Sequence, residues 1–264
     1  MSRAPWLDGR IHAFDLETTG IDVENDRIVT GTWLTGSADG LESTTNWLVD
    51  PGVEIPKQAS DVHGVTTEYA REHGGDPREA VGQMVELLCQ AWVAREPVVI
   101  YNAPYDLTLL DREMRRQDWP GYPEGLLASP VDEDGNVCPP LVVDPLVCDK
   151  RLEKYVRGKG GRKLVNACAR YGIVLTDEEA HTSQGDTTAA WRLAWKMAHR
   201  MPISGMTLHE LQEAQRDWHR AQARDFANYL AKTGKAADAE RVRGEAGQWP
   251  IRPFVAATTE TVPL

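Results

Sequence analysis

Residues 11–20, IHAFDLETTG, decide how the chain is organised. The stretch begins as an apolar β-strand and ends in the turn-forming pair Thr19-Gly20. Asp15 and Glu17 are two residues apart, so on a strand both carboxylates project to the same face. Two converging carboxylates are unfavourable unless a cation lies between them, and hard oxygen ligands suit Mg²⁺ or Mn²⁺. The pattern predicts a metal site at the end of this strand. The alternative is an edge strand with solvated acids.

The segments that follow predict a mixed α/β structure. Residues 27–35 and 44–49 are rich in β-branched and aromatic residues, and Asp39-Gly40 between them suits a hairpin. Beyond them the predicted elements are a helix at 77–96 with Asp76 as its N-cap, a strand at 97–103, a helix at 104–117, a strand and helix within 141–150, and helices at 162–172 and 186–200. We expect one domain in which helices flank a central sheet.

Two stretches are predicted to lack regular core elements. Residues 51–70 carry Pro and Gly punctuation and are interpreted as a loop. Residues 119–140 form a Pro/Gly-rich insertion in which DEDGN is predicted to be the tip of a surface hairpin.

The composition changes after Pro202. Residues 207–234 carry apolar residues at helical spacing and predict one long helix, followed by a polar, Gly-containing tail. We therefore divide the chain into a main domain, residues 1–201, and a C-terminal helical extension, residues 202–264. Amphipathic helices usually bury their apolar face on their own domain, so packing on residues 1–201 is favoured over a partner-binding role.

Two further segments carry candidate site residues. Residues 101–106, YNAPYD, lie where an apolar strand gives way to a helix, and open α/β sheets place their sites at such strand ends. Residues 181–186, HTSQGD, place Asp186 at the start of another helix. Each has a plain structural alternative: Asp106 as a favourable charge in a first helical turn, Asp186 as an N-cap and His181 as an exposed loop residue.

Taken in order, the three segments are more specific than any one of them. FDLETTG, NAPYD and HTSQGD resemble the three motifs of the DEDD exonucleases, the family that includes the proofreading subunit of bacterial replicative polymerase, RNase T and oligoribonuclease. The spacing from His181 to Asp186 is typical of the DEDDh branch. The loop HGVT, residues 63–66, also resembles a segment common in the proofreading group. The resemblance covers residues 10–200.

This resemblance implies an RNase H-like fold with an antiparallel meander of three strands and helices on both faces of a mixed sheet. It also implies that Asp15, Glu17, Asp106 and Asp186 hold two Mg²⁺ or Mn²⁺ ions, with His181 as the general base that deprotonates the attacking water. Two cations can stabilise both the attacking and the leaving oxygen of an in-line displacement, and a histidine near neutral pH can take the proton of a coordinated water.

Substrate contacts are assigned partly through the resemblance. It implies that Thr18 and Thr19 contact the terminal nucleotide through the backbone. We add His63 and Asn102 as candidate substrate-binding residues, although each would also suit an ordinary turn.

Residues 149–163 form a basic loop, with seven Lys or Arg and two Asp or Glu, in a chain of net charge −11. The overall charge argues against a protein that coats duplex DNA, because such binding depends on neutralising many phosphates. A local basic patch suffices for gripping a few terminal nucleotides. Arg157, Lys159 and Arg162 are therefore candidate phosphate contacts, and an ordinary solvated loop is the alternative.

The sequence also indicates the cellular compartment of the protein. No apolar run approaches the ~20 residues that span a bilayer, and the first residues, MSRAPWLDGR, lack the apolar stretch of a signal peptide. The four cysteines form no CxxC pair, so reduced thiols are expected rather than disulfides or a zinc site. We expect a cytoplasmic protein.

The predicted function is a 3′–5′ exonuclease that acts on single-stranded DNA in replication or repair and releases nucleoside monophosphates. An exoribonuclease that trims RNA 3′ ends is the runner-up. The 2′-hydroxyl is the group that distinguishes RNA from DNA, and no residue of the sequence decides which of the two is the substrate. A non-catalytic module that retains the fold is disfavoured by the complete set of site residues. Residues 248–254, QWPIRPF, faintly resemble a sliding-clamp-binding peptide, but anchoring of the tail is the favoured interpretation over clamp or polymerase association.

Overall fold

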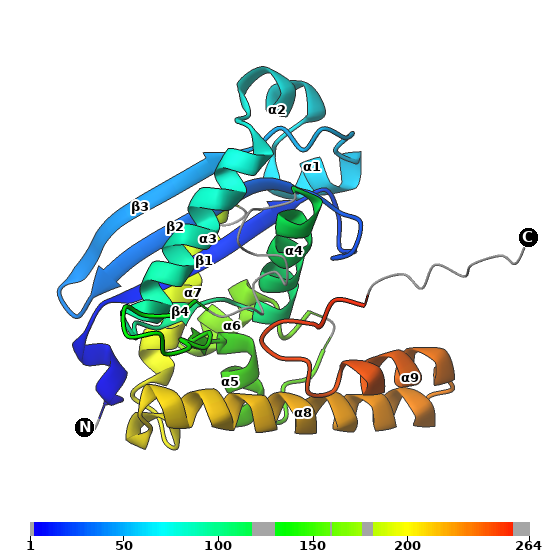
Figure 1. Cartoon of the computed structure of the whole chain (residues 1–264). Coiled ribbons are helices and arrows are strands. Elements are labelled where there is room, and N and C mark those ends of the chain that lie inside the picture. The colour runs from blue at the N-terminus through cyan, green and yellow to red at the C-terminus, as the bar shows by residue number, and fades with distance from the viewer. Residues whose placement is uncertain (1–2, 118–129, 159, 176–181, 256–264) are drawn as a thin grey trace, which may run out of the picture.

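The computed structural model describes residues 3–117, 130–158, 160–175 and 182–255. Within them one mixed sheet has the strand order β3-β2-β1-β4-β5 (Figure 1). An antiparallel meander is formed by β1 (Ile11–Thr18), β2 (Ile28–Ser37) and β3 (Gly40–Leu48). Parallel to β1 lie β4 (Val98–Val99) and then β5 (Val142–Val143). The predicted fold, with its antiparallel first three strands, is confirmed.

Alternate residues of β1 belong to two separate cores. Phe14 and Leu16 pack with residues of α3 (Pro77–Val93) and α4 (Ala103–Arg116). Ile11 and Ala13 pack instead with residues of α7 (Ser183–Met197). Because side chains alternate along a strand, Asp15 and Glu17 follow Ile11 and Ala13 onto the α7 face of the sheet. The α7 side is completed by α5 (Pro145–Leu152) and α6 (Leu164–Arg170).

The prediction of a loop at residues 51–70 is wrong, because two short helices lie there. They are α1 (Lys57–His63) and α2 (Thr67–His73) (Figure 1). The side chain of Thr66 caps α2 by accepting a hydrogen bond from the backbone N–H of Tyr69. Each helix has seven residues and buries little apolar surface. A helix this short leaves almost no periodic pattern in the sequence.

The C-terminal extension contains two helices instead of the one predicted. The first, α8 (Leu208–Lys232), begins at a capping box formed by Thr207 and Glu210. The chain then reverses at Gly234, which has a φ of 81°, and forms α9 (Ala236–Glu245), where a polar tail was predicted. A small cluster that includes Leu230 and Val242 joins the two helices. In the described part of the chain, no helix is long and apolar enough to cross a membrane.

The predicted hairpin within the insertion is present in its described half. Val131 and Val137 form an antiparallel bridge, and the carboxylate of Asp132 accepts hydrogen bonds from the backbone of Asp134 and Asn136. The remainder of the insertion, residues 118–129, lies outside the described residues.

Candidate metal centre

The four predicted carboxylates come from three elements that meet at one end of the sheet. Asp15 and Glu17 lie on β1, Asp106 in the first turn of α4 and Asp186 in the first turn of α7. Asp15, Glu17 and Asp186 are half-buried, and Asp106 is only 3% exposed. The acids of β1 lie about 90 residues before Asp106, and Asp106 lies 80 residues before Asp186, yet the fold brings all of them to one end of the sheet.

The carboxylates lie close enough to disturb one another's ionisation. Burial raises the pKa of Asp15 well above its usual range, and the charges of Asp106, Glu17 and Asp186 raise it further. Burial and then the charge of Asp186 raise the pKa of Glu17 to about 7. Burial also raises the pKa of Asp106, although a hydrogen bond from the backbone N–H of Leu16 opposes the shift. Clusters of like charge with such shifted pKa values are typical of functional sites.

The donor set suits a divalent cation. Among the described residues, no Lys or Arg forms an ion pair with Asp15, Glu17 or Asp106, so their negative charge has no basic side chain to balance it. Carboxylate oxygens are the ligands that Mg²⁺ and Mn²⁺ prefer. No three acidic, His or Cys side chains of the described ranges are gathered tightly enough around one point to form a finished ligand cage. Small side-chain rotations would have to complete it.

The position of Asp106 follows from the way α4 begins. Asn102 adopts the left-handed backbone conformation, with a φ of 69°, which turns the chain sharply from β4 into α4. Asp106 then faces β1, and its Oδ1 accepts a hydrogen bond of 3.1 Å from the N–H of Leu16, between the two acids of the strand. The side chain of Asn102 is exposed at the edge of the site.

The position of Asp186 depends on the start of α7. The hydroxyl of Thr182 accepts a hydrogen bond from the N–H of Gly185 and caps the helix. The hydroxyls of Ser183 and Thr32 lie 2.6 Å apart, and Thr32 on β2 is the strand partner of Asp15. The first turn of α7 is therefore fixed directly beside Asp15.

The turn after β1 is held by its own side chains. The carbonyl of Gly20 accepts hydrogen bonds from the hydroxyls of Thr18 and Tyr105, both at 2.6 Å. Thr19 donates to the carboxylate of Asp26. A Cβ at Gly20 would lie 2.5 Å from that carboxylate, which accounts for the glycine. Since the hydroxyls of Thr18 and Thr19 are used within the turn, backbone contact with a nucleotide is what remains open to them.

His63 comes from α1 and lies against the same turn. Its Nδ1 accepts a hydrogen bond from the N–H of Val65, which orients the ring. Its buried Nε2 lies beside the backbone of Thr18 without a well-formed hydrogen bond to any described residue. Burial lowers the pKa of His63, and the backbone of Thr18 only partly offsets this. The structure thus brings His63 of the HGVT segment, residues 63–66, to the turn that follows β1.

The basic candidates divide into three cases. Arg157 is exposed. Arg162 donates to the buried carboxylate of Asp149 and to the carbonyl of Glu153, so its guanidinium serves a structural ion pair. Lys159 lies outside the described residues, and so does His181, the predicted general base.

The roles of two residues at the site were not predicted from the sequence. Tyr105 stands next to Asp106 within the second motif, and only the fold shows that its hydroxyl reaches the turn after β1. Asp144 is fully buried behind the start of α4 and accepts hydrogen bonds from the N–H groups of Asn102 and Ala103. An Asp-Pro pair between a strand and a helix is an N-cap pattern, which predicts the cap of α5 but not the contact with α4.

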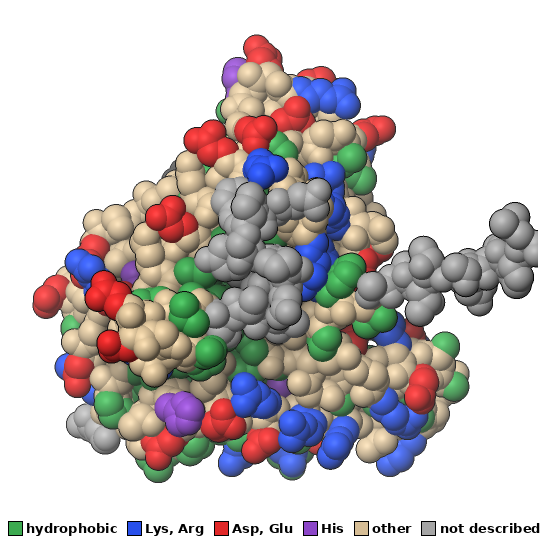
Figure 2. All heavy atoms as spheres, in the orientation of Figure 1, with side chains coloured by type: hydrophobic (Ala, Val, Ile, Leu, Met, Phe, Trp, Pro, Cys, Tyr) green, Lys and Arg blue, Asp and Glu red, His purple; other side chains and the backbone are tan. Residues whose placement is uncertain are grey.

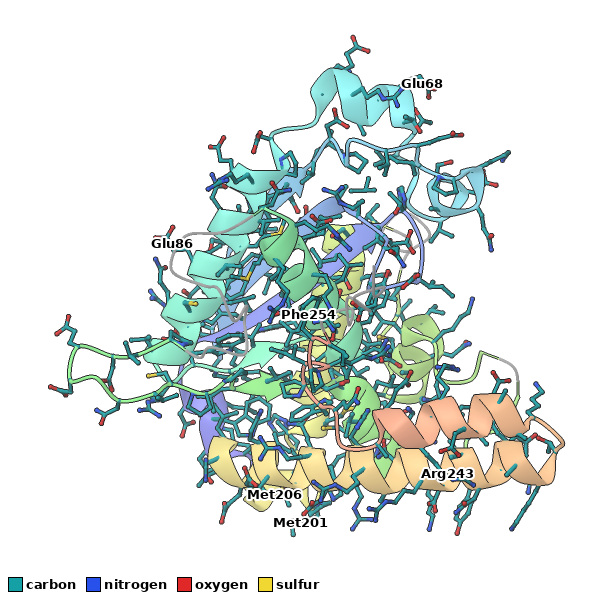
Figure 3. All side chains as sticks on the ribbon, turned by 45° about the vertical axis from the view of Figure 1, so that its right-hand side comes forward. Glu68, Glu86, Met201, Met206, Arg243 and Phe254 are labelled. Carbon is teal, nitrogen blue, oxygen red and sulfur yellow. The ribbon has the colours of Figure 1, made fainter. Side chains whose placement is uncertain are left out.

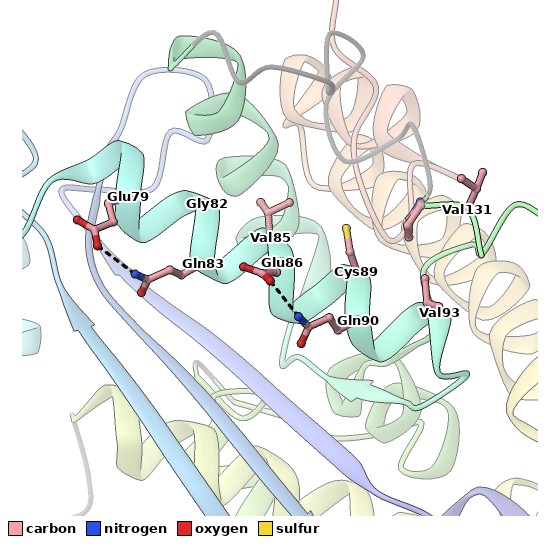
Figure 4. Close-up of a pocket in the computed structure, with 10 residues that line it drawn as sticks. Glu79, Gly82, Gln83, Val85, Glu86, Cys89, Gln90, Val93 and Val131 are labelled. Carbon is pink, nitrogen blue, oxygen red and sulfur yellow. Dashed lines mark hydrogen bonds between the residues drawn. The ribbon is translucent and has the colours of Figure 1, made fainter. Parts of the chain in front are cut away.

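A groove of about 670 Å³ lies elsewhere, along the outer face of α3 (Figure 4). Its walls combine apolar side chains with two Glu–Gln pairs, Glu79–Gln83 and Glu86–Gln90, one turn apart on the helix. It contains none of the four carboxylates. We therefore do not assign it to the candidate metal centre.

Comparisons with known proteins bear on the fold. No family model matches the chain. A DNA polymerase III subunit epsilon-like protein of Rhodobacter capsulatus is 26% identical over 204 residues, which cover 74% of this chain and 24% of that protein. The chain thus spans about a quarter of the length of this curated relative.

Solved structures of Exonuclease I share the fold. The E. coli enzyme in complex with a dT13 oligonucleotide is 16% identical with a TM-score of 0.56, covering 74% of this chain and 42% of that one. Exonuclease I of Methylocaldum szegediense is 19% identical with a TM-score of 0.57, covering 83% of this chain and 45% of that one. The predicted resemblance to the DEDD-type exonucleases is confirmed by these comparisons together.

Proposed function

We propose that this chain is a metal-dependent 3′–5′ exonuclease that acts on single-stranded DNA and releases nucleoside monophosphates. The observation that carries the proposal is the convergence of Asp15, Glu17, Asp106 and Asp186, where burial and then the charges of the other three acids raise the pKa of Asp15. The fold shared with Exonuclease I supports it, as does the dT13 oligonucleotide bound in one of those structures. A role in DNA replication or repair follows from the same relatives.

Each residue has a defined part in the proposed reaction. The four carboxylates would hold two Mg²⁺ or Mn²⁺ ions, which would supply positive charge to the oxygen of the attacking water and to the leaving oxygen of the phosphodiester. Asp106 keeps one oxygen on the N–H of Leu16, which fixes its rotation relative to β1. Glu17 must lose its proton before it can act as a ligand, given a pKa of about 7. A ring nitrogen of His181 would take the proton of the attacking water.

The turn around Thr18 would receive the terminal nucleotide. Its conformation is fixed by the hydroxyls of Thr18 and Tyr105 on the carbonyl of Gly20, so the backbone of the turn is preorganised for contact. Asn102 at the edge of the site and the exposed Arg157 are the side chains proposed to reach the sugar and the phosphates.

The test is release of mononucleotides from single-stranded DNA labelled at its 3′ end, in the presence of Mg²⁺. We expect the label to be released directly as a mononucleotide, without labelled fragments of intermediate length. Internal fragments would indicate an endonuclease, and initial release from the 5′ end would refute the polarity. A matched RNA oligomer in parallel decides the substrate class, and faster release from RNA would favour the exoribonuclease.

Asp15→Asn tests the site assignment. Loss of an outer-shell partner typically costs about 10–100-fold in metal affinity or activity, so removing a direct ligand should lower kcat at least about a hundredfold. Asp39→Asn is the matched control, because Asp39 is exposed in the hairpin at the opposite end of the sheet. Undiminished nuclease activity in Asp15→Asn would overturn both the site and the metal mechanism.

A further inference from the structure

Asp144 is a buried carboxylate that caps two helices at once. It lies at the end of β5 and is 0% exposed. Its Oδ1 accepts hydrogen bonds from the N–H groups of Leu146 and Val147, which begin α5. The same carboxylate accepts from the N–H of Asn102 at 3.0 Å and of Ala103 at 3.1 Å, where α4 begins.

The start of α4 depends on this outside cap. The first N–H groups of a helix lack partners within the helix, and an N-cap side chain usually accepts from one of them. Asn102 occupies the N-cap position of α4, but its left-handed backbone leaves its side chain without a capping hydrogen bond. Asp144, 42 residues further along the chain, supplies the acceptor and places a negative charge at the positive end of α4.

The C-terminal segment holds Asp144 from the other side. The indole Nε1 of Trp249, which is 4% exposed, donates to Oδ2 of Asp144 at 3.3 Å. Asp144 thereby lies between the strand end, two helix starts and the C-terminal segment. Burial raises the pKa of Asp144, and the hydrogen bonds that its carboxylate accepts from Asn102 and Trp249 oppose this shift.

Residues 249–254, which we call the strap, continue along α4. The N–H of Arg252 donates to the hydroxyl of Thr108, and Arg112 donates to the carbonyls of Arg252 and Pro253. The ring of Phe254 lies 4.4 Å from the guanidinium carbon of Arg115 (Figure 3). All of these partners are on α4, the helix that carries Asp106.

We propose that Asp144, anchored by Trp249 of the strap, is a positioning residue that sets the place of the metal-binding carboxylate Asp106. Ala103, which Asp144 holds, lies three residues before Asp106, so both are in the first turn of α4. A shift of that turn would carry Asp106 away from the N–H of Leu16 and from Asp15. The inference rests on the proposed function only for the identity of Asp106 as a metal ligand.

The test compares Mn²⁺ binding by Asp144→Asn and Trp249→Phe, measured by electron paramagnetic resonance on the full chain without nucleic acid. Outer-shell partners of metal ligands typically contribute about 10–100-fold in affinity. We expect the Kd for Mn²⁺ to rise about 10–100-fold in Asp144→Asn and about three- to tenfold in Trp249→Phe, in which the N–H is lost and a smaller aromatic ring remains. The amide hydrogens of residues 105–108 should exchange faster in both variants.

The controls are buried residues of the same kind that form no hydrogen bond to a described residue of α4. Asp149 is also 0% exposed on α5 but pairs with Arg162 and Arg170. Trp92 is 0% exposed, and its indole N–H bonds to none of the described residues. Asp149→Asn and Trp92→Phe should leave the Mn²⁺ affinity within about twofold of the original.

The outcomes separate the two proposals. If Asp144→Asn and Trp249→Phe bind Mn²⁺ as tightly as their controls and exchange at 105–108 is unchanged, the positioning role is refuted. Should Asp144→Asn fail to fold, Trp249→Phe decides the matter by the same two readouts. If the original chain binds Mn²⁺ but releases no nucleotides, the proposed function fails and the positioning role stands on the binding data.

Discussion

At the scale of single residues, the sequence located the acids well because their spacing has a direct geometric meaning. Two carboxylates two apart on a strand must share a face, and Asp15 and Glu17 do so. The roles of Tyr105 and Asp144 were missed because each depends on a contact with a segment more than 40 residues away. Sequence spacing carries no information about such contacts.

Glu17 makes the stability of the metal-free protein depend on pH. A free glutamate titrates near 4.5, and burial and Asp186 raise the pKa of Glu17 to about 7 in the folded chain. Between these values the folded state keeps a proton that the unfolded state has released. The stabilisation that Glu17 contributes is therefore full below pH 4.5 and is lost as the pH rises through 7.

Glu17→Gln should accordingly stabilise the metal-free protein at pH 8 by roughly 2 kcal/mol, given about 1.4 kcal/mol for each unit of pKa shift and partial relaxation. At pH 4.5 the gain should vanish. Denaturant unfolding in EDTA at both pH values measures it, with the exposed Glu54→Gln as the control. A Glu17→Gln protein less stable than the original at pH 8 would contradict the predicted cost of ionising Glu17 in the folded chain.

At the scale of elements, α8 shows where periodicity stops being informative. Its apolar stripe predicted a packed helix, yet its most deeply buried residues include two glutamines. Gln212 and Gln215 bond both backbone groups of Val142 and the N–H of Asp144, and so cover the free edge of β5. An exposed strand edge invites pairing with other chains, and here polar side chains of a helix satisfy it. A hydrophobic pattern cannot reveal that arrangement.

Gln215→Ala should therefore destabilise the protein out of proportion to the size of the side chain. It leaves the N–H of Asp144 and the carbonyl of Val142 buried without partners, at a cost of about 1–3 kcal/mol for each group. Urea unfolding should show a loss of about 2–4 kcal/mol. Asn228→Ala, at an exposed position of the same helix, should change stability by less than about 0.5 kcal/mol. Equal effects of the two substitutions would contradict the role of the edge contacts.

At the scale of the whole molecule, the distribution of charge limits where a substrate can bind. Basic side chains gather over α8 and α9 on the face in Figure 2. Four arginines of these two helices pair with acids one turn away on the same helix: Arg216, Arg220, Arg241 and Arg243. Such internally paired charge attracts phosphates weakly. The segment that follows α5, residues 153–163, remains the better candidate for phosphate contact, because Arg157 has no ion pair with a described residue.

Arg157→Ala should raise the KM for a single-stranded oligomer about two- to fivefold at low salt, the effect of one exposed charge, and the difference should fade at high salt. Arg162→Ala should behave differently. It removes one of two arginines from the buried Asp149, so it should lower the thermal stability. Steady-state kinetics at two ionic strengths, combined with thermal melting, separate the two effects. A KM for Arg157→Ala that equals the original at low salt would remove this residue from the substrate path.

The C-terminal extension is predicted to be part of the folding unit, although the sequence suggested a division near residue 201. Leu211 packs in one core of the sheet, and Trp249 and Ile251 pack in the other. Burial of each contributes about 2 kcal/mol, and the glutamine contacts add to this, against a total stability of about 5–15 kcal/mol for a typical domain. A chain ending at residue 201 should therefore fail to fold, while the full chain should unfold in one cooperative transition by calorimetry and circular dichroism. A soluble 1–201 fragment with a cooperative transition of its own would show instead that the extension is a separable addition.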